Sequence, residues 1–444
     1  MLQNYLFPVN ELQSPREIIF QTTSLGKLRQ VLPLDRLAAL LPAKGSARGA
    51  KAWLAPEGML ALLFLKSYTG LSDEQLIEHL NGNWQMQLFC GMRLADNEQI
   101  KDVTLVSRIR SYVAKHLDLQ LFQEELIRYW KPQLKETQVL FCDATVYESD
   151  MKYPTSVKLL WDCCLFSHEL YEDLLKSCKL KRAKNAFNEQ QLKQSTFNLL
   201  RKKSQRKSRR RCQQLIKLLT RLNGLIKDVF RLMGDRLQLA GRLRERFDLV
   251  EQVLKEQRFL LENPGKKLPD RVLSLYKPFV RSIVRGKENK PCEFGAKVHM
   301  LQVDGINIIE HYSYAAYNEC KRVEASLALH GRLFGTCHQF AGDRIYATNA
   351  NRKYLSERKI ATGFVQKGRG DTPEKKTLRA LLNKERSTRL EGSFGTEKNH
   401  YDLRRIKARN QANETLWMFF GVMTANAVRM VTKREKAQAP DLAA

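Results

Sequence analysis

The 444-residue sequence predicts an α/β protein in which helices flank a mixed sheet, with an all-α N-terminal domain and a basic helical insertion. Three observations lead to this prediction. Short apolar runs of strand type occur on both sides of a long helical stretch, and two of them flank Asp304-Gly305, a strong hairpin signal. Residues 156–268 carry leucine and isoleucine at helical spacing almost without interruption. Near the N-terminus, WLAPEGMLALLFLKSY (53–68) suits a buried helix.

The charge of the chain restricts its partners. Its 76 lysine and arginine residues outnumber 47 aspartate and glutamate residues, giving a formal net charge of +29, which indicates a polyanion. No apolar run is long enough to cross a membrane and no signal peptide is evident, so we expect nucleic acid rather than an anionic membrane surface. The nine cysteines are scattered without a C-x-x-C pair, which argues against a zinc site or disulfide framework and for reduced thiols in a cytoplasmic protein.

Residues 1–136 are expected to form a helical N-terminal DNA-binding domain. Pro56 falls in the first turn of the leucine-rich helix, and Ser72 caps the next one. A third, basic helix follows, and three short helices ending in a basic one are typical of a helix-turn-helix-like unit. Arg108 and Arg110 would then face DNA. A plain helical bundle with a solvated basic face explains the same pattern.

Residues 137–155 hold the first predicted strand. Its apolar run stops at Asp143, where an α/β sheet presents functional groups, although strand-end aspartates often only cap loops. Thr155 caps the first helix of the basic insertion, residues 156–268. Within this insertion the run RKKSQRKSRRR predicts phosphate contacts, with a solvated charged segment as the alternative. The candidates for these contacts are Arg201, Lys202, Lys203, Arg206, Arg209, Arg210 and Arg211.

Residues 269–432 are expected to complete the core. After the hairpin and a helix, a strand ends at Asp343, and a later helical region contains Glu391. An apolar helix follows and closes the core, and residues 433–444 look like a disordered tail.

Acidic residues thus come from two strands and a later helix, which is the layout of RNase-H-like nucleases. In such enzymes two divalent ions about 3.5–4 Å apart clamp the attacking and leaving oxygens of a phosphodiester. Hard oxygen ligands suit Mg²⁺. Glu391 stands among basic residues, and Lys398, seven positions later, would share its helix face. A solvated helix with scattered ion pairs is the alternative interpretation.

Three blocks of the sequence closely resemble the catalytic blocks of DDE transposases from bacterial insertion sequences. They are FCDATVYESDMKYPT, QFAGDRIYATNANRKYL and RLEGSFGTEKNHYDLRRIKAR, and they occur in the right order. The segment APEGMLALLFLKSYTGLSDEQLIEHL is similar to the helical domain that precedes the core in those proteins. The resemblance implies that Asp143, Asp343 and Glu391 are catalytic and bind Mg²⁺, for which Mn²⁺ would substitute.

The same resemblance places Lys398 near DNA phosphates, with Arg389 as a weaker candidate. Arg404 and Arg405 complete this group of DNA-binding candidates. Two positions depart from the pattern: Ser156 stands where many relatives carry Asp, and Lys384 where some carry Tyr. Serine caps a helix nearly as well as aspartate, so the first departure does not imply inactivity.

We therefore expect a transposase that binds the terminal inverted repeats of its element, cleaves DNA with metal and transfers the freed strand to a target. Its partner would be double-stranded DNA at the bacterial nucleoid, without a membrane or a small-molecule substrate, and it would act as a homodimer or larger assembly. The alternatives are an inactive, transposase-derived DNA-binding protein and a metal-dependent nuclease without strand transfer. An RNA substrate is more remote, since nothing resembles an RNA-binding motif.

Overall fold

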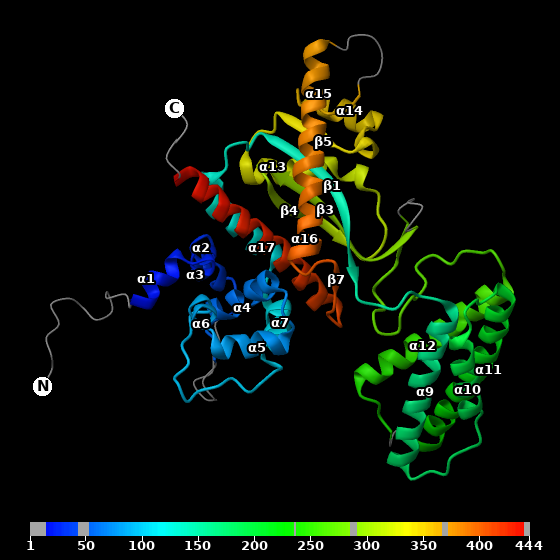
Figure 1. Cartoon of the computed structure of the whole chain (residues 1–444). Coiled ribbons are helices and arrows are strands. Elements are labelled where there is room, and N and C mark those ends of the chain that lie inside the picture. Colours follow the sequence, from blue (N-terminus) through cyan, green and yellow to red (C-terminus); the bar gives the residue numbers. More distant parts are fainter. Residues whose placement is uncertain (1–14, 43–52, 235–236, 285–290, 366–371, 439–444) are drawn as a thin grey trace, which may run out of the picture. The chain divides into compact units, whose positions relative to one another are not determined.

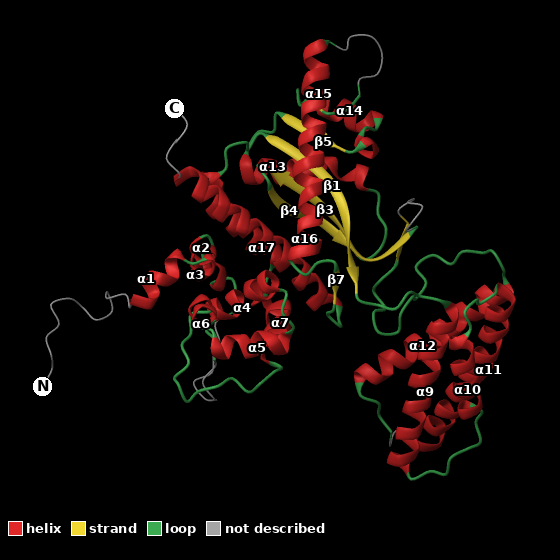
Figure 2. Ribbon diagram, in the orientation of Figure 1, coloured by secondary structure: helices red, strands yellow, loops and turns green. Residues whose placement is uncertain are grey.

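The computed structural model describes residues 15–42, 53–234, 237–284, 291–365 and 372–438 (Figure 1). The chain divides into two compact units. The first combines residues 1–150 with 295–444, and the second comprises residues 151–294. Helices predominate, and the strands form a curled mixed sheet (Figure 2), which confirms the prediction of a mixed α/β protein.

The first unit begins with short helices. They are α1 (Pro15–Thr22), α2 (Ser24–Gln30), α3 (Leu34–Ala38), α4 (Pro56–Thr69), α5 (Asp73–Gly82), α6 (Trp84–Phe89), α7 (Leu105–His116) and α8 (Leu119–Trp130), followed by a 3₁₀ turn, Lys131–Gln133. The predicted positions of Pro56 and Ser72 at the starts of two helices are confirmed. Pro56 opens α4, Gly70 ends it in a left-handed conformation, and Ser72 forms a capping box with Gln75.

The sheet is built around β1. Its strands are β1 (Val139–Ser149), β3 (Cys292–Val303), β4 (Ile306–Ser313), β5 (Gln339–Gly342), β6 (Ala361–Thr362) and β7 (Arg405–Ile406). β1 pairs antiparallel with β3 and parallel with β5 and β7, while β4 adds to β3 and β6 to β5. Asp304 and Gly305 have φ values of 48° and 82°, so the predicted two-residue hairpin turn is confirmed.

Further helices surround the strands of the first unit. They are a 3₁₀ turn (Glu319–Arg322), α13 (Val323–Phe334), a second 3₁₀ turn (Arg344–Tyr346), α14 (Asn349–Glu357), α15 (Pro373–Glu385), a π-helical segment (Arg386–Glu391), α16 (Gly392–His400) and α17 (Gln411–Gln438). α17 is buried over most of its length because it packs against α4 and α7 and also against β4. The N-terminal helices and the sheet therefore share one core.

Part of the predicted disordered tail is helical. α17 continues through the first part of the segment expected to be disordered, because its last turns are anchored to the rest of the first unit. Lys433 Nζ lies 2.7 Å from Asp304 Oδ2, and Arg434 Nε donates to Gln133 Oε1 at 2.7 Å. Residues 439–444 of the predicted tail lie outside the described residues, as do residues 1–14 of the predicted N-terminal domain.

The second unit is mainly helical. Its elements are α9 (Ser156–Cys178), α10 (Phe187–Leu199), α11 (Gln205–Met233), α12 (Gly241–Glu262) and the short strand β2 (Ser282–Val284), which pairs with the first residues of β3. Thr155 caps α9 as predicted. α11 packs against α9 and α12 through a stripe of fully buried residues that includes Leu215, Leu219 and Leu222. The helical character expected of this stretch is confirmed.

We expect Gly295→Ala to destabilise the first unit. An added Cβ would lie 2.0 Å from the Tyr147 carbonyl oxygen, and backbone in a paired strand cannot move aside. The expected loss is about 1–3 kcal/mol in the free energy of unfolding, measured by denaturant titration. Gly331→Ala in α13 is the control, since a Cβ added there would meet nothing within 4 Å; an equal loss in both variants would contradict the prediction.

Candidate active site

Two of the predicted catalytic residues are brought together by strand pairing. In the parallel β1–β5 ladder Cys142 lies opposite Gly342, and Asp143 and Asp343 are the residues that directly follow this pair in the sequence. Neighbouring strands run about 4.8 Å apart, and matched residues of parallel strands point the same way. Gly342 leaves room for the Tyr346 ring, because a Cβ there would lie 2.9 Å from it. The two aspartates are therefore neighbours.

The strand-end interpretation was right for Asp343 and wrong for Asp143. β5 ends at Gly342, and the Asp343 carboxylate accepts a hydrogen bond from the Arg344 amide at 2.6 Å. β1 instead continues to Ser149, because β3 pairs with one of its edges as far as Glu148 and β7 pairs with its last two residues. What stops near Asp143 is the pairing with β5, which leaves that edge of β1 open.

Glu391, the third predicted catalytic residue, joins Asp143 through Arg386. Arg386 Nη1 lies 2.8 Å from Asp143 Oδ2 and 2.9 Å from Glu391 Oε1, and the arginine side chain is only 11% exposed. The π-helical segment explains the geometry, since i→i+5 hydrogen bonding places Arg386 directly above Glu391 on one face. The positively charged Arg386 guanidinium thus lies between two of the three predicted catalytic carboxylates.

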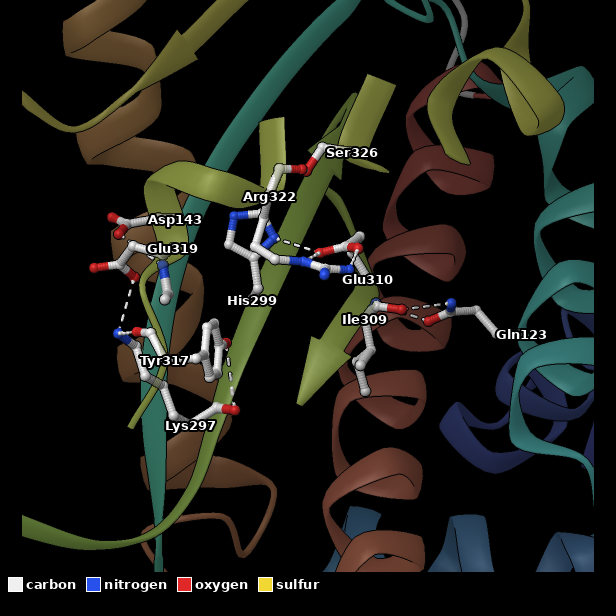
Figure 3. Close-up of polar contacts among 11 residues, drawn as sticks. Gln123, Asp143, Lys297, His299, Ile309, Glu310, Tyr317, Glu319, Arg322 and Ser326 are labelled. Carbon is white, nitrogen blue, oxygen red and sulfur yellow. Dashed lines mark hydrogen bonds and ion pairs between the residues drawn. The ribbon is translucent and has the colours of Figure 1, made fainter. Parts of the chain in front are cut away.

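The surroundings of Asp143 disfavour the charged form of its side chain. Burial raises its pKa to about 6, and the negative charges of Glu319 and Glu391 act in the same direction. The Ala144 amide and Arg386 oppose this shift. Glu319, beside Asp143 in Figure 3, was not identified from the sequence; its carboxylate also lies 3.6 Å from Lys297 Nζ. No motif marks Glu319, because a 3₁₀ turn far along the chain brings it to the site.

Behind this carboxylate pair the sheet carries a buried charged group. His299 Nδ1 lies 3.0 Å from Glu310 Oε2, and Arg322 pairs with the same carboxylate (Figure 3). Burial alone would raise the pKa of Glu310, but hydrogen bonds from His299 and Arg322 hold it below its usual value. Glu310 is thus fully engaged in anchoring the 3₁₀ turn that carries Glu319.

The basic candidates near the triad differ in their contacts. Lys398 Nζ donates to Thr145 Oγ1 at 2.8 Å, and Thr145 lies two residues beyond Asp143 on the same face of β1. Arg389 pairs with Glu136 and Glu385, and Arg405 pairs with Asp150. Arg404 is exposed. Among these candidates, Lys398 is therefore the one that contacts the strand of Asp143 close to that residue.

The remaining basic candidates belong to other segments of the chain. Arg108 is exposed and pairs with Asp102, whereas Arg110 is buried against Asp73. In the second unit the exposed candidates of the basic run are Arg201, Lys202, Lys203, Arg206, Arg209 and Arg210. Arg211 differs from them, because its guanidinium is buried and donates to Gln190, Gln194 and Gln214. Arg110 and Arg211 thus bind protein groups rather than facing solvent.

As the side chains stand, no three or more His, Cys, Asp and Glu residues in the described part of the chain are grouped so that they could hold a metal ion. In this arrangement the Arg386 guanidinium pairs with both Asp143 and Glu391. Among the described helices, none is both long and apolar enough to span a membrane.

We expect Asp143→Asn to stabilise the protein more at pH 8 than at pH 4. The wild-type carboxyl has a pKa of about 6 in the folded protein, against an ordinary value of 3.8. Protonation of Asp143 therefore favours the folded wild-type protein below pH 4, and this contribution to stability is lost as pH rises through 6. The difference between the two pH values should be at most about 3 kcal/mol. Unfolding titrations in EDTA measure it, and an identical effect at both pH values would contradict the assignment.

A comparison with protein families supports a transposase. Residues 13–112 match a family model described as "Transposase domain (DUF772)". This stretch contains α1 to α6 and most of α7, which surround the buried α4. No curated protein and no solved structure matches the chain. The matched domain supports a transposase.

Proposed function

We propose that the protein is a DDE transposase whose sheet is an RNase-H-like catalytic core. The observation that carries this proposal is the β1–β5 register, which makes Asp143 and Asp343 neighbours while Arg386 links Asp143 to Glu391. The transposase-domain match supports it independently, because that match lies in a different part of the chain. The substrate would be the terminal inverted repeats of an insertion sequence.

The carboxylates fit divalent cations of the Mg²⁺ type, with Mn²⁺ as a substitute. Asp143, Asp343 and Glu391 offer hard oxygen ligands, and the Arg386 guanidinium already marks a cation position between two of them. Bound there, the metal would supply an activated water or 3′-hydroxyl nucleophile and would neutralise charge on the phosphodiester. Arg386 would have to leave its position when metal binds.

The protein's own residues would position the DNA. Lys398 is held by Thr145 on the strand of Asp143, so its ammonium can neutralise a phosphate next to the reacting one. The exposed arginines and lysines of residues 201–210 would contact DNA and add salt-sensitive affinity. Since strand transfer joins two ends, a homodimer or larger assembly on DNA in the bacterial cytoplasm completes the proposal.

A DNA-binding protein that no longer cleaves is the second candidate. The ion pairs of Arg386 with Asp143 and Glu391 favour it, because a permanent internal cation would keep metal out. Product analysis separates the candidates. Joined DNA molecules indicate a transposase, nicked or linear products alone indicate a nuclease, and binding without bond breakage indicates the DNA-binding protein.

We expect Asp143→Asn and Asp343→Asn each to abolish joined products, by at least about 100-fold, in a reaction of purified protein with element-end DNA, target plasmid and Mg²⁺. End binding should remain, because neither aspartate contacts phosphate without metal. Asp35→Asn, on the exposed side of α3, is the control and should react like wild type. Equal joining by a triad variant and wild type would refute the assignment of these residues.

We expect Arg386→Ala to bind Mn²⁺ about tenfold or more tightly than wild type, because metal no longer has to displace charge-assisted hydrogen bonds. Isothermal titration of the DNA-free protein measures this directly. Arg389→Ala is the matched control, since that arginine pairs with Glu136 and Glu385 instead of the triad. Unchanged affinity in the Arg386 variant would show that the guanidinium does not compete with the ion.

A further inference from the structure

A polar cleft of about 650 Å³ lies in the first unit, and its lining does not include the predicted catalytic residues. Its walls come from the end of α4, the start of α5, one face of α7 and the start of α17. Residues 407–410, which precede α17, form part of its lining. The cleft therefore joins the region of the family match to the segment that follows the helix of Glu391.

The deep part of the cleft is charged but internally neutralised. Lys66 Nζ lies 3.0 Å from Asp402 Oδ2, and Arg110 Nη2 lies 2.6 Å from Asp73 Oδ1. Both cations also lie over the Trp417 indole, with their charged centres 4.3 Å and 4.5 Å from its centroid. The two cations are almost fully buried, at 5% and 8% side-chain exposure. These contacts fix a rigid floor that carries little net charge.

The rim, in contrast, carries uncompensated positive charge. Lys407 and Arg409 are exposed, and neither forms an ion pair or hydrogen bond with any residue that the structure describes. Ile406 and Ala408 alternate with them and are buried, which orients the two basic side chains outward. Since Asp73 and Asp402 are the acidic groups of the lining and both are paired, two positive charges remain.

Neutral hydrogen-bond donors complete the lining. The hydroxyls of Ser107 and Ser111 on α7 lie in the cleft wall, and Ser111 Oγ accepts a hydrogen bond from Asn413 Nδ2 at 3.0 Å. Trp417 is only 8% exposed, so its ring offers little surface for a stacked base. Two cations with nearby hydroxyls suit the oxygens of a phosphate group and do not select among bases.

We propose that this cleft binds a backbone phosphate of DNA, with Lys407 and Arg409 contacting its oxygens and the serine hydroxyls adding hydrogen bonds. The identity of the polymer rests on the proposed function, whereas the phosphate chemistry rests on the lining itself. The segment that carries both cations includes β7, which pairs with the last residues of β1. DNA bound in the cleft would thus contact a segment that is hydrogen-bonded to β1, the β-strand that carries Asp143.

The test measures DNA binding by the full chain in EDTA, where no cleavage occurs. Lys407→Ala/Arg409→Ala should lower the affinity for a duplex about tenfold or more and should reduce the slope of log affinity against log salt by about two. Lys353→Ala/Arg358→Ala, at α14 and the residue that follows it, is the matched control, since it removes one lysine and one arginine from the same unit. An equal slope change in both double variants would overturn the proposal.

Inorganic phosphate provides a second arm. Tryptophan emission should change on phosphate titration in wild type and stay constant in Trp417→Phe, because that indole is part of the cleft floor. The same titration of Lys407→Ala/Arg409→Ala should show weakened binding; undiminished phosphate binding would overturn the assignment of these residues. Because neither arm measures joining, these results can stand even if the triad variants show that the protein is not a transposase.

Discussion

The register of β1 between its neighbours is the constraint on which the site depends. β1 is paired with β3 on one side and with β5 and then β7 on the other, so its position cannot slip without breaking several ladders together. A shift of one residue would turn Asp143 to the opposite face and separate it from Asp343. The chemistry of the site therefore follows from backbone hydrogen bonds far more than from the local sequence around either aspartate.

The second feature on which the site depends is the compensation of the buried negative charge of Asp143. Glu319 and Glu391 both disfavour ionisation of Asp143, and burial adds to their effect. Arg386 offsets part of this cost from a π-helical segment, a conformation found often at functional sites.

The sequence predicted features that depend on short stretches of chain. The turn at Asp304-Gly305 and the cap at Ser72 follow from neighbouring residues alone, and both are present. The π-helical segment was missed, because its residues read as ordinary helix and nothing local to them marks the wider turn. The burial of Arg211 was missed because two of its partners, Gln190 and Gln194, lie on α10, outside the basic run.

The path of the chain through the first unit has a consequence for its biosynthesis. β1 is made before residues 151–294, yet its partners β3 and β5 come after them, and α4 packs against α17, which is made last. At roughly 5–20 residues per second, a ribosome leaves β1 and the apolar α4 without these partners for about ten seconds or longer. The second unit, with a core of its own, can fold during this interval. The nascent first half is therefore a natural client for chaperones, and a prematurely terminated chain would lack the helix that closes its core.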